Sequence, residues 1–347
     1  PTCATTARQD GTMSLKGTVL KATVWPRTNW RVGNLLGEGA CAQVYEVSSP
    51  DQAADVEYVA KVAPLPPVAA GANKKRKMSQ QEKNVNVLHG EHDLYRGALR
   101  GHPAIPAVPD GGYGDDQGVR FLVLQRLGDD LSQIAQAAGG RGLSLALVKD
   151  YGAQMLSALR HLHEVHKMVF VDVKPANFML GRPSTPEANK VFLIDFGLAR
   201  RYLKLGGAHA PFSEKPGAVE GTPNFLSRRC HGGGSAGRRD DMEALGYVLL
   251  FLLGGEEALP WAKAKSDKEG RAIKEGTPLP KLCARWPALA DFIHLAATTP
   301  FDQAPDYTAL AGLLARLQQA GPKAAPAGPG GAAAAPPRAD AAVQKAS

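Results

Sequence analysis

The sequence has few cysteines, and none lie close enough together to form a familiar thiol site. Among 347 residues there are four, widely spaced and without a Cys-x-x-Cys pair: Cys3, Cys41, Cys230 and Cys283. Disulfide scaffolds and structural zinc sites both need thiols at short, regular spacings. We therefore expect a reducing compartment and a fold that depends on its hydrophobic core.

Long hydrophobic runs are also missing. The longest lies within Leu245–Leu253, far below the ~20 apolar residues that a membrane-spanning helix needs, and it predicts a buried helix. The sequence starts at Pro1 and shows no basic segment followed by an apolar stretch, which is the pattern of a secretory signal. Neither feature favours a membrane partner.

Charge of one sign is in modest excess: 41 Lys and Arg against 33 Asp and Glu give a net charge of +8. A basic surface favours acidic or phosphorylated partners, and nucleic acid as a secondary partner. The simpler interpretation is a solvated basic face, because charge alone describes solubility. The sequence has no basic stripe interleaved with aromatic residues, so a nucleic-acid-binding module is the weaker hypothesis.

The first part of the sequence is rich in short β-strand patterns. Residues 1–29 lack periodicity, and we expect them to form a leader. One helix is expected over residues 79–99. Runs of β-branched and aromatic residues bounded by turn residues predict strands over 31–36, 43–47, 58–62 and 121–124.

The rest of the sequence is helical. Apolar residues at helical spacing predict helices within 147–163, 240–253 and 286–317. The tail, residues 321–347, is rich in Ala, Pro and Gly and cannot bury enough surface to become ordered. The sequence therefore predicts an α+β fold of two lobes, with a small antiparallel sheet over residues 30–127 and a helical lobe over 128–320.

Two polar clusters in the second half carry the strongest chemical signal. They are Asp172-Val173-Lys174-Pro175-Ala176-Asn177 and Asp195-Phe196-Gly197. Phosphoryl transfer from ATP needs a carboxylate to orient the accepting hydroxyl, and Mg²⁺ to neutralise phosphate oxygens. Asp172 suits the first role. Asn177 and Asp195 offer hard oxygen ligands to the metal, and Lys174 can stabilise charge on the moving group.

Weaker signals precede these clusters. Gly37-Glu38-Gly39 lies between two predicted strands, where glycine lets the backbone approach a phosphate. Lys61 ends a short strand, and Glu91 lies on the predicted helix. Each alone has an ordinary interpretation, namely a hairpin turn, an exposed lysine and a solvated glutamate. In this order, ahead of the two polar clusters, a coincidence is negligible.

Together these motifs resemble those of the eukaryotic protein kinase family, over about residues 30–317. The resemblance implies the bilobal protein kinase fold and an enzyme that uses ATP and Mg²⁺ to phosphorylate protein hydroxyls. It makes Asp172 the catalytic base, and Asn177 and Asp195 the Mg²⁺ ligands. Lys174 resembles the lysine of Ser/Thr kinases, and Thr222 resembles the threonine that contacts the base and this lysine.

The resemblance also assigns the nucleotide site. It places Gly37 and Gly39 over the phosphates, and pairs Lys61 with Glu91 and with the α- and β-phosphates. The adenine pocket is expected from five apolar side chains, for which ordinary core packing is an equally open interpretation: Val44, Ala60, Leu124, Met179 and Ile194.

Further segments indicate a branch of the family. Gly221–Ser227 occupies the place of the usual Ala-Pro-Glu motif, and Arg238–Tyr247 is similar to a run in casein kinase 1 relatives. Asn29–Gly33, Tyr58–Val62 and Arg126–Leu131 resemble vaccinia-related kinases more closely. This branch implies Ser/Thr protein substrates in the nucleus or cytoplasm, with chromatin-associated proteins among the expected partners.

One departure from the family bears on regulation: Phe170-Val171 replaces the usual His-Arg before the base. Without that arginine an activation-loop phosphate has no partner, so the resemblance implies activity without such phosphorylation. Phe170 is expected to pack against Phe196, with Tyr95 next in the stack. Asp241 is expected to brace the catalytic-loop backbone.

Some features leave alternatives open. Ala42 stands where a third glycine is usual, and together with the Phe170-Val171 replacement it motivates the hypothesis of an inactive scaffold; the retained polar residues argue against that hypothesis. The Lys74–Lys77 cluster predicts a nuclear-import signal, an anion-binding patch or a solvated insert. Three neighbouring histidines lack acidic or cysteine ligands at metal spacing, and we expect them to be structural: His161, His163 and His166.

Overall fold

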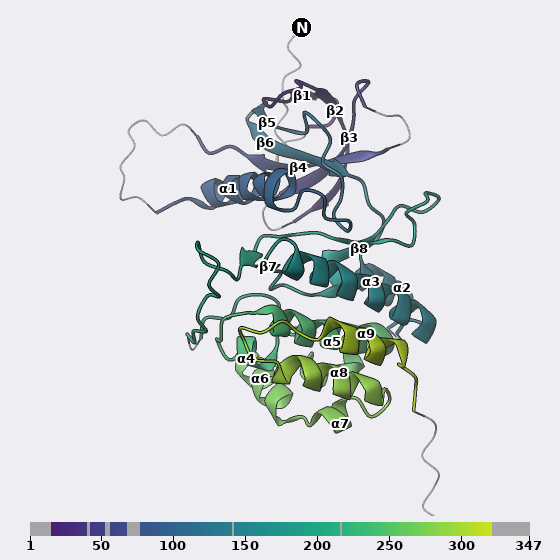
Figure 1. Ribbon diagram of the computed structural model, residues 1–347. Helices are drawn as coiled ribbons and strands as arrows, with labels where there is room; N and C mark the ends of the chain where they lie inside the picture. The colour runs from purple at the N-terminus through teal and green to yellow at the C-terminus, as the bar shows by residue number, and fades with distance from the viewer. Residues whose placement is uncertain are drawn as a thin grey trace, which may run out of the picture.

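The computed structural model describes most of the chain. Its residues form an antiparallel sheet followed by a helical region, with the sheet above the helices in the view of Figure 1. The predicted α+β class is confirmed. The predicted tail and most of the Lys74–Lys77 cluster lie outside the described residues, which are 15–39, 42–52, 56–67, 77–140, 142–215 and 217–320.

The sheet has six strands in the order β1-β2-β3-β4-β6-β5, and every neighbouring pair is antiparallel. One face of the sheet buries its own apolar cluster, which includes Trp30, Tyr45 and Phe121. Because side chains alternate along a strand, the other face is left for the helices and the site. The strands are β1 (Val19–Lys21), β2 (Asn29–Glu38), β3 (Gln43–Ser48), β4 (Tyr58–Pro64), β5 (Tyr113–Asp116) and β6 (Val119–Gln125).

We expected residues 1–29 to form a leader outside the fold, and strand β1 shows that this prediction is wrong for part of the segment. Residues 15–29 of it are described. Val19–Lys21 pair with Asn29–Arg31, and Leu20 is fully buried in the cluster above the sheet. Three residues are too short for an alternating pattern to stand out, so this strand depends on tertiary pairing that periodicity does not reveal. The sheet therefore begins before residue 30.

Helix α1 (Gln80–Asp93) begins at a capping box, in which Ser79 accepts a hydrogen bond from the Glu82 backbone and the Glu82 side chain accepts one from the Ser79 backbone. It continues into the π-helix η1 (Leu94–Ala98), where the Leu99 N–H donates to the Leu94 carbonyl. The helix that the sequence predicts over 79–99 thus has a wider last turn. That turn places Tyr95 in the core.

The helical region is built around α3 (Leu145–Glu164) and α5 (Arg238–Gly254), which pack against each other and bury most of their apolar side chains. The further helix predicted within 286–317 is present as two helices, separated by a segment that contains Pro300 and Pro305. The other elements are α2 (Leu131–Ala137), β7 (Met168–Val169), η2 (Pro175–Asn177), β8 (Phe178–Leu180), β9 (Val191–Leu193), β10 (Arg200–Arg201), α4 (Arg228–His231), η3 (Glu256–Ala258), α6 (Asp267–Gly276), α7 (Leu279–Leu282), α8 (Pro287–Thr298) and α9 (Tyr307–Ala315).

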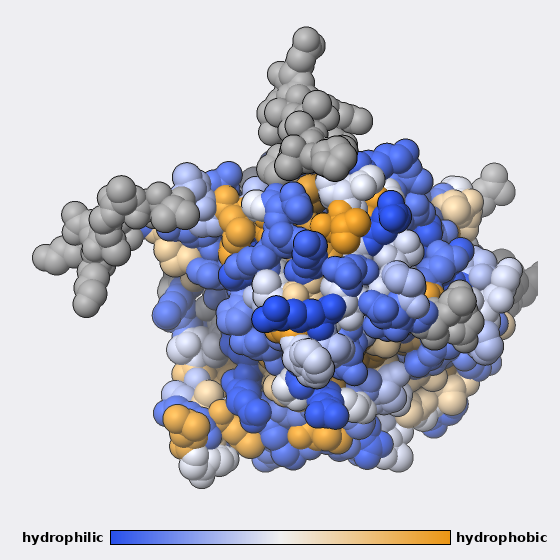
Figure 2. All heavy atoms as spheres, turned by 90° about the horizontal axis from the view of Figure 1, so that it is seen from above, coloured by the Kyte–Doolittle hydropathy of each residue, from blue (hydrophilic) through white to orange (hydrophobic). Residues whose placement is uncertain are grey.

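The surface over the sheet is mainly hydrophilic, with small and separated apolar patches (Figure 2). Among the described residues, none of the helices is both long enough and apolar enough to cross a membrane. Cys230 and Cys283, the cysteines within the described part of the chain, are free and buried.

Candidate active site

Lys61 and Glu91 meet between the sheet and α1. The Lys61 Nζ lies 2.6 Å from the Glu91 Oε1, and the Glu91 side chain is 8% exposed. Val85, Leu88 and Glu91 follow one another on the buried face of α1 at intervals of three residues, so helical geometry directs Glu91 inward. A buried carboxylate needs a cation, and Lys61 from β4 supplies it. The structure brings this predicted pair together.

Asp172 lies at the centre of a polar cluster on the loop after β7. Its Oδ1 accepts a hydrogen bond of 2.8 Å from the Thr222 hydroxyl, and its Oδ2 lies 2.7 Å from the Lys174 Nζ. The Asn177 Nδ2 donates to the Asp172 backbone carbonyl at 2.9 Å. Gly221 has a φ of +105°, and a Cβ there would lie 2.9 Å from the Leu226 side chain. Glycine thus lets the Thr222 segment approach the aspartate closely.

The loop before Asp172 is fixed from α5. Asp241 is 1% exposed and accepts hydrogen bonds from the backbone N–H groups of Phe170, at 2.7 Å, and Val171, at 2.8 Å. Val171 has a φ of +74°, which is strained for a β-branched residue and persists only where surrounding contacts impose it. Asp241 supplies these contacts, so the predicted bracing of this loop is confirmed.

One of the three histidines expected to be structural also holds Asp241. The His163 Nε2 lies 2.9 Å from the Asp241 Oδ2, the oxygen that also accepts the Phe170 N–H, and its Nδ1 lies 2.8 Å from the Tyr307 hydroxyl. His161 and His166 instead pack against the ring of His102. The structural interpretation of these histidines is therefore confirmed.

Asp195 is exposed to solvent, whereas the neighbouring Phe196 is buried in the core. Phe196 is 2% exposed and meets Phe170 edge-to-face, with ring centroids 5.3 Å apart, and Tyr95 at 5.7 Å. This is the stack that the sequence predicts. Asp195 is exposed, with a φ of +63°, and shares with Glu91 a cavity of about 500 Å³. Its carboxylate therefore lies on the same side of the molecule as the Lys61–Glu91 pair.

Comparison with known proteins decides what this arrangement is. A model of the protein kinase domain matches residues 30–288. The chain belongs to the protein kinase family. The order of its motifs, the bilobal architecture and the paired lysine and glutamate are therefore those of a kinase, and the predicted protein kinase fold is confirmed.

The chain is also similar to casein kinase I enzymes of fungi. It is 34% identical to casein kinase I homolog 1 of Schizosaccharomyces pombe over 251 residues, which are 70% of this chain and 54% of that protein. It is 30% identical to homolog 3 of the same organism over 294 residues, or 82% of the chain and 61% of that protein. It is also 30% identical to casein kinase I homolog 1 of Saccharomyces cerevisiae over 296 residues, which are 82% of this chain and 50% of that protein. The chain thus spans about half the length of these relatives.

The nucleotide side of this kinase needs one correction: the prediction that Ala60 lines the adenine pocket is wrong. Ala60 is fully buried within the cluster on the far face of the sheet, beside Trp30 and Tyr45. Because strand side chains alternate, Ala60 points away from the face that carries Lys61. Val59, two residues before Lys61, points to the same face of the sheet as Lys61. It pairs with Leu124 on β6 and packs against the core cluster that includes Leu122 and Leu124. Counting two residues back from Lys61 would have found it.

The structure locates the other four residues of the predicted adenine pocket, whose contact with a nucleotide stays a prediction. Val44 pairs with Lys61 across β3 and β4, and so shares its face. Leu124 lies on that face of β6. Met179 lies on β8, and Ile194 follows β9, with its N–H bonded to the Asn177 carbonyl.

Between Gly37 and Val44 the glycine-rich loop is described except at residues 40 and 41. Gly37 pairs with Val44, and the Gly39 N–H donates to the Ala42 carbonyl at 2.8 Å. Among the described residues, a Cβ on Gly37 would meet nothing within 4 Å, and one on Gly39 would meet only the Ala42 carbonyl, at 3.4 Å. The packing of the described residues therefore does not require glycine at these two positions.

Lys274 is a site-supporting residue that the sequence does not reveal. It is fully buried, and its Nζ donates to the carbonyls of Pro223 and Leu226, at 2.7 and 2.8 Å. Burial lowers the pKa of Lys274 to about 7. It holds the segment that replaces the Ala-Pro-Glu motif, just after Thr222. A helical lysine is usually exposed to solvent, so nothing in the sequence indicated that Lys274 is buried.

Proposed function

We propose that this chain is an active, ATP-dependent protein Ser/Thr kinase of the casein kinase I type. The observation that carries the proposal is the hydrogen-bonded cluster of Asp172, Thr222 and Lys174. A scaffold would need none of these contacts, whereas a phosphotransferase needs a carboxylate held in one orientation beside a cation. The partly exposed Asp172 carboxylate can meet a substrate hydroxyl.

In this proposal Asp172 orients the serine or threonine hydroxyl and accepts its proton as the oxygen attacks the γ-phosphate. Thr222 fixes one carboxylate oxygen, and Lys174, on the other, stabilises negative charge on the transferred group. Lys61, held by Glu91, contacts the α- and β-phosphates. The open space above Gly37 and Gly39 lets their backbone approach the phosphates.

The donor set at the proposed metal site fits Mg²⁺. The Asn177 amide nitrogen faces the Asp172 carbonyl, which leaves the amide oxygen as the atom that can bind a cation. Asp195 adds an exposed carboxylate, and oxygen ligands are those that Mg²⁺ prefers. Mg²⁺ bound by Asn177 and Asp195 would neutralise the charge of the phosphate oxygens.

Activity without activation-loop phosphorylation is part of the proposal. Val171, at the place of the usual arginine, packs in an apolar cluster with Val169 and Tyr202. This packing supports a loop that is positioned without a phosphate. The finer resemblance to vaccinia-related kinases, and substrates among nuclear or cytoplasmic chromatin-associated proteins, remain predictions of the sequence.

Radiolabelled ATP tests the proposal, with casein, histone and the chain itself as acceptors. We expect Mg²⁺-dependent label on serine or threonine, and a loss of about 10²–10⁴-fold in Asp172→Ala. Mg-ATP should raise the melting temperature of both proteins, because the variant keeps the nucleotide site. Equal transfer by both proteins would contradict the role of Asp172. No transfer and no thermal shift in the wild type would favour the inactive scaffold.

A further inference from the structure

Two histidines and an aspartate gather on the last turn of α1, beside Tyr113 of β5. The atoms of His89, His92 and Asp93 that could bind a metal ion all lie within 4.8 Å of one another. The His89 Nε2 lies 3.4 Å from the Asp93 Oδ2, and the His92 Nδ1 lies 3.2 Å from the Asp93 Oδ1. Spacings of three and four residues bring these side chains to one side of the helix. The group is separate from the proposed catalytic cluster around Asp172.

The distances in this group are close to those between the ligands of a bound zinc ion. Zn²⁺ binds imidazole nitrogen and carboxylate oxygen in a tetrahedral arrangement, which places neighbouring ligand atoms about 3.3–3.5 Å apart. Both nitrogen–oxygen distances are near this value, so small rotations of the side chains would complete the set. Two histidines and a carboxylate are also a ligand set of zinc sites with an open fourth position. Water can reach that position, because His89 and Asp93 are exposed.

Tyr113 positions both histidine rings. Its hydroxyl lies 2.9 Å from the His89 Nδ1, and its ring stacks on that of His92 with centroids 4.0 Å apart. Because a hydroxyl oxygen can accept the Nδ1 proton, the first contact favours the tautomer that leaves Nε2 free to bind a metal. Histidines that bind metals typically have such a partner on the other nitrogen. Tyr113 is buried and pairs with Leu122 in the sheet, so the fold itself holds these rings in place.

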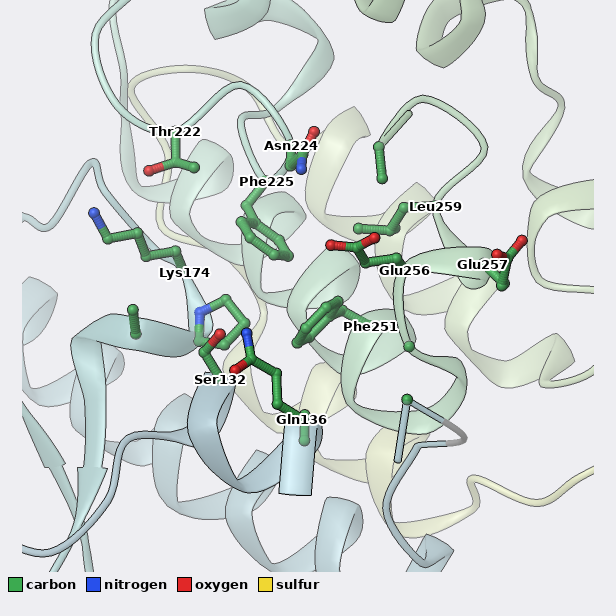
Figure 3. Close-up of a pocket in the computed structure, with 16 residues that line it drawn as sticks. Ser132, Gln136, Lys174, Thr222, Asn224, Phe225, Phe251, Glu256, Glu257 and Leu259 are labelled. Carbon is green, nitrogen blue, oxygen red and sulfur yellow. The ribbon is translucent and has the colours of Figure 1, made fainter. Parts of the chain in front are cut away.

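Other parts of the molecule offer no comparable set of ligands among the described residues. The cavity of about 640 Å³ shown in Figure 3 has Lys174 and Thr222 in its wall, but no histidine or cysteine is among its described lining residues. In the histidine group around His102, the His102 Nε2 lies 3.1 Å from the Ala158 carbonyl, and the Nδ1 accepts the Ala104 N–H at 3.0 Å. Both nitrogens of that ring are therefore engaged, which directs attention to α1.

We propose that His89, His92 and Asp93 bind Zn²⁺, with water as the fourth ligand. Imidazole nitrogen distinguishes this site from the proposed Mg²⁺ site, because Mg²⁺ prefers oxygen ligands. The inference goes beyond the proposed kinase function and does not depend on phosphotransfer. The ligands flank Glu91, which contacts Lys61 from the buried face of the helix. A metal that joins residues 89 and 93 therefore fixes the helical turn that carries Glu91.

Calorimetric titration of the full chain with Zn²⁺ tests the site, in excess Mg²⁺ so that oxygen-only sites are occupied. His92→Phe keeps a ring against Tyr113 but has no nitrogen, and we expect its affinity for Zn²⁺ to fall at least about tenfold. Asp93→Asn changes an exposed side chain and should also weaken binding at least about tenfold. His294→Ala, at an exposed histidine on α8, is the matched control and should bind like the wild type. Cysteines would bind zinc alike in all four proteins, so the differences report this site.

Two further measurements separate a built site from a chance pair of histidines. Tyr113→Phe keeps the ring and removes the hydroxyl, and it should weaken zinc binding about tenfold. Zn²⁺ should also slow hydrogen exchange of the backbone N–H groups over residues 89–98 in the wild type, and not in Asp93→Asn. No zinc binding by the wild type would overturn the proposal. Equal affinity in the wild type, His92→Phe and Asp93→Asn would overturn it as well, because the metal would then be bound elsewhere.

Discussion

The two halves of the proposed active site are held in different ways. In the small lobe, Lys61 and Glu91 meet through one ion pair between a strand and a helix. In the large lobe, the loop before Asp172 is fixed by two buried hydrogen bonds to Asp241. A single contact between two elements breaks when either moves, whereas a buried network holds its members together. The comparison indicates that the loop before Asp172 is preset, whereas the position of Lys61 depends on one ion pair.

Asp241→Asn should have the largest effect, because it breaks the network of the large lobe. The asparagine would turn an N–H group toward backbone N–H groups that now donate to a carboxylate, leaving buried donors unpaired. We expect a loss of about 3–5 kcal/mol in the free energy of unfolding, measured in urea, together with loss of phosphotransfer. The exposed Asp302→Asn serves as control. A stable and active Asp241→Asn protein would remove the contrast between the lobes.

Glu91→Gln should reduce activity and leave stability nearly unchanged. Without its charge, residue 91 holds Lys61 less firmly, and phosphotransfer should fall about 10²-fold. The exposed Asp302→Asn again serves as control. Because the glutamine oxygen can still accept an N–H of the partly exposed Lys61, urea unfolding should show a loss of only about 1 kcal/mol. A loss of stability as large as that of Asp241→Asn would show that both lobes are held alike.

The two faces of the sheet should respond differently to enlarged side chains. Ala60→Leu overfills the cluster above the sheet and should cost about 1–3 kcal/mol of stability with little change in the KM for ATP. Val59→Phe, one residue earlier, should instead raise the KM for ATP. Steady-state kinetics and urea unfolding of both variants measure this contrast. An increase in KM for Ala60→Leu alone would restore the original prediction for Ala60.

Lys274 should give the smallest effect, as a pH dependence of stability. Its pKa of about 7 lies below the value of 10.5 for an ordinary lysine, so above pH 7 the unfolded state binds the extra proton. Stability should therefore rise between pH 7 and about 8.5, before thiols titrate, by about 1–2 kcal/mol. In Lys274→Met this rise should vanish. Parallel urea-unfolding profiles for the two proteins would show that Lys274 keeps its proton on folding.

The sequence predicted the parts of the site that depend on local order along the chain. Asp172, Asn177 and Asp195 lie in short motifs whose spacing is fixed by the backbone, and the structure describes Asp172 and Asn177 in direct contact. Glu91 could also be found, because its buried position follows from helical spacing. Ala60 was misplaced by a single residue, since the alternation of a strand reverses the face at every step.

Features formed by distant segments could not be predicted. Strand β1 depends on pairing with β2, and Lys274 is buried only because α6 packs against the loop after Thr222. The cavity beside Lys174 likewise joins α2, the segment around Phe225 and the end of α5. Tertiary packing decides all three, and periodicity within one segment carries no information about it.

The central claim is that Asp172 accepts the proton of the substrate hydroxyl from a preset position. Steady-state phosphotransfer by Asp172→Asn tests it most directly, because asparagine keeps the size of the side chain and cannot accept the proton. The account predicts that kcat falls about 10²–10⁴-fold, while the shift in Tm caused by Mg-ATP is unchanged. A kcat equal to that of the wild type, with the same shift, would contradict it.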